Sequence, residues 1–254
     1  MPTRISEAFV LDATVLKERD KIVTLFTEEE GKLRGLAHGA ARSVKRFGGR
    51  LERLSRVRAS WFEKEGQDLV RIDDLELVRE SFSMHQDLLK SAAISYICEL
   101  AEEFTREKEA DRRYYRLLVA VLDGLRAGIS PALLLRYFEF WTGRLHGILP
   151  AFGACDGCGR AFGAHGARVA PRGEAALCER CAPGSDATMR LSRGALGLIE
   201  AFRNAPPSEF AHVVYPAGAL REVETAAVSA LVAFTGREIR SAPFLRQVMA
   251  EERK

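Results

Sequence analysis

Two short cysteine motifs constrain the fold of this chain more strongly than any other part of its sequence. Each is a Cys-x-x-Cys turn, and 19 residues that include glycines and a proline separate them. Such a turn presents two thiolates together, and the intervening segment lets the two turns face each other. The four cysteines are Cys155, Cys158, Cys178 and Cys181. Their spacing predicts a tetrahedral zinc site.

We expect this zinc to be structural, because four sulfur ligands leave the ion no open position at which to activate water. It would hold together a segment too short to fold by burial alone. A redox pair is the alternative for a single motif, but two motifs at this separation favour a metal. The nearby cations that would offset the thiolate charge are Arg160, Arg168, Arg172 and Arg180. His165, between the motifs, is expected on the surface.

The 254 residues are enough for one large domain or two to three small ones. An apolar fraction of 47% with 29% charged residues is typical of soluble globular proteins. No apolar run approaches the ~20 residues of a membrane span, and the N-terminal MPTRISEAFV lacks a core of the signal-peptide type. We therefore expect a cytoplasmic, nucleoid-associated protein with no membrane partner, whose reduced cysteines are metal ligands or buried apolar groups.

The first 79 residues show the pattern of a small β-barrel. Runs of β-branched and aromatic residues separated by turn residues predict five strands, over 8–16, 22–27, 32–36, 57–62 and 69–78. Five short strands in about 75 residues are typical of an OB-type barrel. Barrels of this class commonly bind single strands through aromatic stacking and a cationic rim.

A strongly basic segment lies between residues 32 and 58. It holds nine cations and a single acid, Glu52, for a net charge of +8 in a chain whose total is only +3. Such a block on a glycine-containing loop predicts a polyanion site whose binding weakens with salt. A merely solvated basic loop is the alternative. The predicted DNA-binding residues are Lys32, Arg34, Arg42, Lys45, Arg46, Arg50, Arg53 and Arg56.

Aromatic residues near this segment are candidates for stacking against bases. They are Phe9, Phe26, Phe47, Trp61 and Phe62. Most aromatic side chains in a small barrel belong to its core. We expect Phe47 to be the most exposed of the five, because it lies on the loop between Arg46 and Gly48.

After residue 80 the hydrophobic period changes from two to that of a helix. The pattern predicts helices over 81–105, 111–126, 131–148, 192–202, 219–234 and 243–251. Ser130-Pro131 supplies an N-cap and a favoured first-turn proline for the third helix, which is apolar enough for the centre of a bundle. Cys98 has apolar neighbours on the first helix and is expected in the core.

These elements predict an α+β multidomain protein in four segments. Residues 1–79 form an OB-fold DNA-binding domain, and residues 80–150 form the first part of a helical domain. Residues 151–189 form a zinc-binding insertion, and residues 190–254 form the second part of the helical domain, packed on the first.

We do not expect an enzyme. The sequence has no GxxxxGK[ST] phosphate loop, no GxSxG elbow and no HExxH helix, and its five histidines are scattered. Asp73 and Asp74 are adjacent strand residues that point to opposite faces, so they do not favour a metal-dependent nuclease. A sequence-specific regulator is also disfavoured, because no helix gathers basic and amide residues on one face.

Several stretches together resemble the RecO family of bacterial recombination mediators, from Glu7 to about Cys181. They are EAFVL (7–11), DKIVTLFTEEEGKLRGLAHGAARSVKRFGG (20–49), LELVRESF (75–82), RYFEFWTGRLHGILP (136–150) followed by CDGCG, and CERC. Some members of the family lack the zinc cysteines, whereas this chain keeps all four.

The resemblance implies an N-terminal OB barrel, a helical domain and a zinc-binding element. It implies binding to single- and double-stranded DNA, annealing of complementary strands without ATP, and work with RecR, often also RecF, to load RecA on strands covered by single-strand-binding protein. In some members the helical domain captures the acidic tail of that protein. The apolar third helix with Arg136 is our candidate for such a pocket.

A mechanism follows as a hypothesis. A cationic surface that neutralises two phosphate backbones lowers the repulsion between complementary strands, and base pairing then supplies specificity. The alternative is a zinc-ribbon adaptor that binds only proteins. It would hold the metal but show no salt-dependent affinity for DNA.

Overall fold

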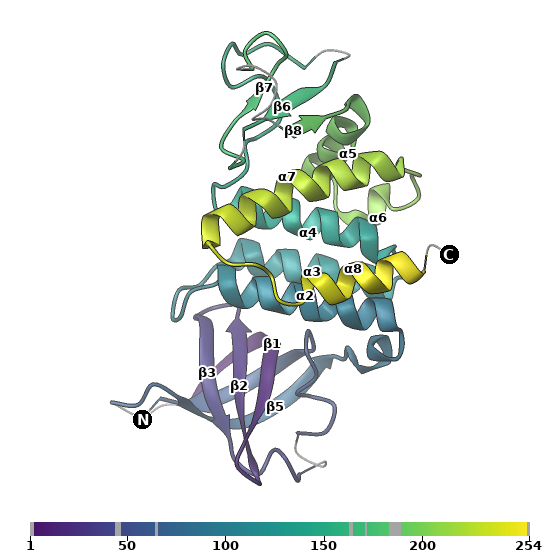
Figure 1. The fold of residues 1–254 in the computed structure, drawn as a ribbon. Helices are drawn as coiled ribbons and strands as arrows, with labels where there is room; N and C mark the ends of the chain where they lie inside the picture. Colours follow the sequence, from purple (N-terminus) through teal and green to yellow (C-terminus); the bar gives the residue numbers. More distant parts are fainter. Residues whose placement is uncertain are drawn as a thin grey trace. The chain divides into compact units, whose positions relative to one another are not determined.

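The computed structural model describes residues 3–43, 47–63, 66–162, 165–170, 172–182 and 189–252. The chain divides into two compact units. The first comprises residues 1–116 and 239–254, and the second comprises residues 117–238. Figure 1 shows a barrel of strands in the first unit and mostly helices in the second.

Five strands form a closed barrel in the first unit (Figure 1). They are β1 (Arg4–Leu16), β2 (Asp20–Thr27), β3 (Gly31–Ala37), β4 (Arg56–Phe62) and β5 (Val70–Arg79). Their order is β1-β2-β3-β5-β4, with β4 pairing back to β1, and only the β3–β5 pair is parallel. This topology confirms the predicted OB-type barrel.

Alternating residues of each strand fill the barrel interior. Val23 and Leu25 point inward from β2, and Trp61 points inward from β4. Gly35 allows β3 to pass over Ile72, because a Cβ at this position would lie 2.6 Å from the Cγ1 of Ile72. The opposite residues of the same strands therefore face outward, and among them are several of the predicted cations.

Described residues of the connection between β3 and β4 contribute to the barrel core. Phe47 is 2% exposed and joins the barrel core together with Ala40 and Leu51. The prediction that Phe47 is exposed is therefore wrong. Its neighbours in sequence are basic and glycine-rich, but the ring packs with the apolar side chains of the barrel core.

Helical segments of the first unit cover the outer face of β1 and β2. They are η1 (Phe82–Gln86), α2 (Leu88–Phe104), the beginning of α3 (Arg112–Arg126), and α8 (Ala242–Glu251), which packs on α2. Phe9 and Phe26 point outward into this layer and are fully buried against Tyr115 and Tyr114, with ring centroids 5.0 and 6.0 Å apart. Cys98 is also buried there, as predicted, and burial raises its pKa to about 12.

The second unit packs its helices around α4. They are the rest of α3, α4 (Pro131–Leu145), α5 (Arg193–Asn204), α6 (Pro207–Phe210) and α7 (Ala217–Thr235). Helix α4 contacts α7 and α5, as expected for the centre of a bundle. Pro131 begins α4, although the side chain of Ser130 makes no capping hydrogen bond. The helix ends at Leu145, before the predicted residue 148, because Gly147 adopts a left-handed conformation (φ 69°).

Arg136 of α4 lies in the interior of this unit and not on a surface. Its side chain is 3% exposed, and it forms ion pairs with Glu139, at 2.7 Å, and with Glu224 of α7. This guanidinium is therefore already paired with carboxylates of the protein itself. The suggestion that Arg136 marks a pocket for an acidic tail is wrong.

A small three-stranded sheet accompanies the cysteine motifs. Its strands are β6 (Ala167–Val169), β7 (Ala176–Leu177) and β8 (Met189–Leu191), in the order β7-β6-β8. The segment lies between α4 and α5 of the same unit, and β8 contacts α7. The four-segment domain division stays a prediction. No helix in the described ranges is long and apolar enough to cross a membrane.

Candidate metal centre and nucleic-acid interface

The structure brings the four motif cysteines together. The sulfur atoms of Cys155, Cys158, Cys178 and Cys181 all lie within 4.8 Å of one another, so the group could hold a metal ion. The sulfurs of Cys158 and Cys178, one from each motif, are 3.8 Å apart. Within the described part of the chain, this is the only such group of three or more histidine, cysteine or acidic side chains.

Backbone hydrogen bonds shape the two turns and join them. In the first turn, the amide of Gly159 donates to the carbonyl of Cys155 at 2.8 Å, and in the second the amide of Cys181 donates to Cys178 at 3.0 Å. The amide of Cys178 also donates to the sulfur of Cys155 at 3.2 Å. Gly157 lies where the turns meet, and a Cβ there would make a tight contact, 3.2 Å from the Cβ of Cys181.

The surroundings of the sulfurs already favour one thiolate. The hydrogen bond from the Cys178 amide lowers the pKa of Cys155 to about 6. Hydrogen bonds to the sulfurs of Cys158 and Cys178 raise the pKa of Cys181 to about 12, because neighbouring sulfurs cannot all be deprotonated without repulsion. A bound cation would remove this conflict, since it stabilises every thiolate that it contacts.

The cysteine element is fixed to the rest of the second unit through a close contact. Gly173 has a left-handed φ of 80°, and a Cβ at this position would lie 2.5 Å from the Cβ of Ala230 on α7. Arg168 pairs with Glu179 at 3.0 Å, so its charge is balanced by that acid. His165 is exposed, as predicted.

Four of the predicted DNA-binding arginines lie on or beside the barrel and differ in how strongly they are paired with acids. Arg34 is exposed on β3 and makes no ion pair among the described residues, whereas Arg42 lies 3.4 Å from Glu18. Arg53 donates two hydrogen bonds to Asp12, at 3.2 and 2.6 Å. Arg56 pairs with Glu7 at 2.5 Å and donates to the hydroxyl of Tyr115 at 3.2 Å.

The remaining predicted cations differ in their surroundings. The ammonium of Lys32 donates to the carbonyl of Glu102 at the end of α2, 2.5 Å away, and its side chain is half-buried. Arg50 is half-buried on the connection between β3 and β4. Lys45 and Arg46 lie outside the described residues. The DNA-binding role of the whole set stays a prediction.

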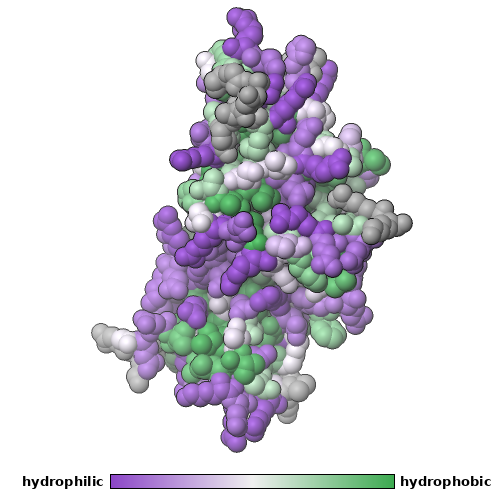
Figure 2. All heavy atoms as spheres, in the orientation of Figure 1, coloured by the Kyte–Doolittle hydropathy of each residue, from purple (hydrophilic) through white to green (hydrophobic). Residues whose placement is uncertain are grey.

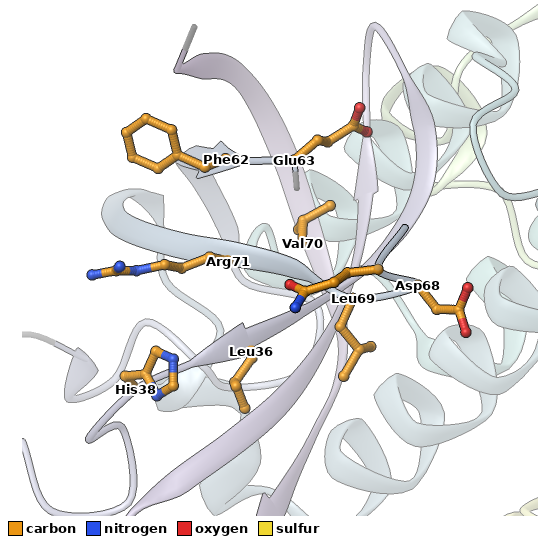
Figure 3. A pocket seen from close by; sticks show the side chains of 9 residues that line it. Leu36, His38, Phe62, Glu63, Asp68, Leu69, Val70 and Arg71 are labelled. Carbon is orange, nitrogen blue, oxygen red and sulfur yellow. The ribbon is translucent and has the colours of Figure 1, made fainter. Parts of the chain in front are cut away.

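Of the five aromatic stacking candidates, only Phe62 is partly accessible. Phe9, Phe26 and Trp61 are fully buried, and Phe47 is 2% exposed. Phe62 ends β4 on the outside of the barrel and lines a cleft together with Leu36, His38 and Arg71 (Figure 3). Arg71 lies outside the basic segment, so sequence reasoning missed it. The alternation of β5 places it outward, but its position opposite Phe62 follows from the strand register, which the sequence alone does not give.

Comparisons with known proteins cover almost the entire chain. The model of the family Recombination protein O N terminal matches residues 1–81, and that of Recombination protein O C terminal matches residues 85–241. "DNA repair protein RecO" of Anaeromyxobacter sp. (strain K) is 34% identical over 239 residues, which is 94% of each chain.

Two further relatives carry the same name. That of Geobacter sulfurreducens is 34% identical over 246 residues, 95% of this chain and 97% of the relative. That of Koribacter versatilis is 37% identical over 154 residues, 61% of this chain and 63% of the relative. These similarities confirm the predicted resemblance.

Proposed function

This chain belongs to the recombination protein O (RecO) family, and on that premise we propose that it is a DNA repair and recombination mediator. It binds single- and double-stranded DNA and anneals complementary strands without ATP, as a binding protein and not as an enzyme. The observation that carries this proposal is an OB-type barrel whose outer surface and β3–β4 connection bear the most basic segment of the chain.

The ion pairs divide the cations into two groups. Arg42 and Glu18 are both largely exposed, and such a pair contributes only about 0–1 kcal/mol, so a phosphate can replace the carboxylate. Arg34 has no competing acid among the described residues. Arg56 is held by Glu7 and by the buried Tyr115, so it supports the barrel more than it contacts DNA. Arg34 and Arg42 therefore lead the proposed contacts.

The proposed annealing mechanism is electrostatic. Cations on the barrel and its loop neutralise the backbones of two strands and release their counterions, which lowers the repulsion between the strands. Base pairing then selects the correct partner, and no nucleotide is consumed. Binding therefore weakens uniformly for all sequences as salt rises.

The metal proposed for the four cysteines is a structural Zn²⁺. A tetrahedral zinc site with Zn–S bonds of about 2.3 Å places its sulfurs about 3.8 Å apart. The 3.8 Å between Cys158 and Cys178 fits this geometry, and four thiolates suit a soft, redox-inactive ion. When bound, the ion would hold the two turns together and stabilise all four sulfurs as thiolates.

Proposed partners follow from the family resemblance. They are RecR, often RecF, the C-terminal tail of single-strand-binding protein, and RecA indirectly, in the cytoplasm at the nucleoid. The relatives are named for DNA repair, which supports the general role of the chain in that process.

An annealing assay tests this function. Complementary labelled oligonucleotides are mixed with the protein without ATP at increasing salt, and the wild type is compared with an Arg34→Gln/Arg42→Gln variant. We expect rapid annealing that fades with salt and is several-fold slower in the variant. A matched control, Arg193→Gln/Arg221→Gln, removes two exposed charges from α5 and α7 and should anneal like the wild type.

The second candidate is a zinc-ribbon adaptor that binds only proteins. The ordered cysteine cluster favours it as much as it favours the mediator. Absence of annealing and of DNA binding by the wild type at low salt, with metal still bound, would reject the mediator and leave the adaptor.

A further inference from the structure

The four sulfurs of the cysteine cluster are unequally accessible. Cys155 is buried, Cys178 and Cys181 are half-buried, and Cys158 is exposed. Over the part of the molecule that carries β6 and β7 in Figure 1, hydrophilic side chains gather on the face seen in Figure 2. A small polar molecule dissolved in water therefore reaches Cys158 more readily than the other three cysteines.

Cys158 also has a partner sulfur within reach. Its sulfur lies 3.8 Å from that of Cys178, which belongs to the other motif. A disulfide bond holds its sulfurs about 2.05 Å apart, so these two must approach each other by about 1.8 Å. Rotation of the two side chains about their Cα–Cβ bonds supplies such a movement without displacing the turns. The sulfur of Cys155, by contrast, is held by the amide of Cys178, which donates to it at 3.2 Å.

The two turns are also joined by contacts that need no metal. The amide of Asp156, in the first motif, donates to the carbonyl of Ala176 on β7 at 2.9 Å, and the amide of Ala176 donates back to the carboxylate of Asp156 at 2.7 Å. Strand β7 ends at Leu177, directly before Cys178. Hydrogen bonds to an ionised carboxylate are stronger than those between neutral groups. Asp156 therefore keeps the second motif beside the first even when the sulfurs hold no ion.

We infer that the cysteine cluster is a reversible redox switch, in which hydrogen peroxide joins Cys158 and Cys178 in a disulfide bond and the metal is released, while Asp156 keeps the two turns together. The inference rests on the structural Zn²⁺ proposed above. The thiolate is the form of cysteine that binds a metal, and the sulfurs of a disulfide carry no negative charge. Only Cys155 and Cys181 then remain as ligands, too few for a closed tetrahedral site.

The oxidation proceeds in two steps. In the first, the thiolate of Cys158 attacks one oxygen of hydrogen peroxide: an S–O bond forms, the O–O bond breaks and hydroxide leaves, so the sulfur is oxidised to a sulfenic acid and the peroxide is reduced. In the second, the thiolate of Cys178 attacks that sulfur: the S–S bond forms, the S–O bond breaks and a second hydroxide leaves. A thiol reductant supplies the two electrons that reverse the reaction.

The test begins with the zinc content of the purified chain, which is then treated with limiting hydrogen peroxide while a chromogenic chelator follows the released metal. We expect the loss of about two free thiols per chain for each zinc ion released. Cys98→Ala, which changes the cysteine of the first unit, should give the same result. Retention of zinc after these thiols are oxidised would overturn the switch and leave the proposed metal standing, whereas absence of zinc before treatment would overturn both. Neither result depends on DNA binding, which the annealing assay tests separately.

Peptide mapping identifies the bond that forms. Trypsin cleaves after arginine and so separates the four cysteines into three peptides, residues 145–160, 173–180 and 181–190. Mass spectrometry under non-reducing conditions should find the first two of these joined, and fragmentation should place the bond on Cys158 and Cys178. A bond between Cys155 and Cys158, or a link to Cys181, would overturn the assigned pair.

Two variants test the role of Asp156 in the metal-free state. Asp156→Ala removes the acceptor for the amide of Ala176, and Glu174→Ala, at an exposed acid of the same element, is the matched control. Both start from equal zinc content and are oxidised, reduced with dithiothreitol, freed of it and supplied with zinc again. The control should regain its metal as the wild type does, and Asp156→Ala should regain several-fold less. Equal recovery by the two variants would overturn the role of Asp156 in keeping the turns together.

Discussion

The guanidinium of Arg136 lies 2.7 Å from the carboxylate of Glu139, one turn further along α4, and both side chains are at most 3% exposed. Removal of one member of such a pair leaves a buried charge without its partner, which costs about 3–5 kcal/mol. Replacement of both by apolar side chains of similar volume is often neutral, because neither charge then remains to be desolvated.

We therefore predict that Arg136→Met lowers the free energy of unfolding by about 3–5 kcal/mol, and that Arg136→Met/Glu139→Met recovers much of this loss. Urea denaturation followed by circular dichroism measures both variants. Glu224, the second partner of Arg136, is 29% exposed and can be hydrated, so it adds little to the cost in the double variant. A single variant as stable as the double one would contradict the prediction.

For the cysteine cluster, we predict about one zinc ion per chain in protein purified without chelator, and its loss in Cys178→Ser. Elemental analysis of the purified chains gives the answer directly. Cys98→Ala is the control, because this cysteine is buried in the other unit and its loss should leave the zinc content unchanged. Retention of full zinc by Cys178→Ser would remove this residue from the ligand set.

The attachment of the start of α8 to Glu99 should depend on pH. Burial alone would raise the pKa of Glu99, but hydrogen bonds from the hydroxyl and amide of Ser241 and from the amide of Arg240, at 2.6 to 2.8 Å, lower it below its ordinary value of 4.5. A carboxyl with a depressed pKa stabilises the fold above its unfolded pKa, and this contribution disappears as the pH falls through the folded pKa.

Hydrogen exchange in residues 240–251 should therefore be faster in Glu99→Gln than in the wild type at pH 7. The difference should shrink as the pH falls through the lowered pKa of Glu99, because the wild-type carboxylate is then itself protonated. Glu200→Gln, an exposed change on α5, should leave this exchange unchanged. An unchanged rate in Glu99→Gln at pH 7 would show that these hydrogen bonds do not hold α8 in place.

Alanine substitutions at two glycines of the second unit allow the cost of backbone strain to be compared with the cost of strain and steric clash together. Gly147 and Gly173 both have positive φ, but a Cβ meets nothing within 4 Å at Gly147 and lies 2.5 Å from Ala230 at Gly173. We predict that Gly147→Ala costs about 1–2 kcal/mol through strain alone, and that Gly173→Ala costs clearly more. Thermal unfolding compares the two, and equal losses would mean that α7 yields to the added methyl group.

The sequence was sufficient to predict the barrel and the helices, because both depend on local periodicity. The run from Ile22 to Thr27 alternates as a strand, and the apolar row of α4 repeats as a helix, whatever their neighbours are. The cysteine cluster was equally predictable, since the spacing within each motif fixes the geometry of its turn.

Contacts between distant residues could not be predicted in this way. Phe47 lies between a cation and a glycine, so its local sequence does not indicate that it packs in the barrel core. The partners of Arg53 and Arg56 come from β1, more than 40 residues earlier, and they alter which cations remain available. Arg71 became a candidate only once the register placed it beside Phe62.

The route of the chain between the two units affects the order in which the protein can be completed. The first unit contains residues 1–116, but it also contains α8, at residues 242–251, so the second unit is inserted into the first. On the ribosome, where domains generally fold as they emerge, the barrel and the whole second unit are synthesised before α8 reaches its place on α2. A chain truncated before α8 would therefore lack part of the first unit, which contains the barrel, but would still contain the complete cysteine element.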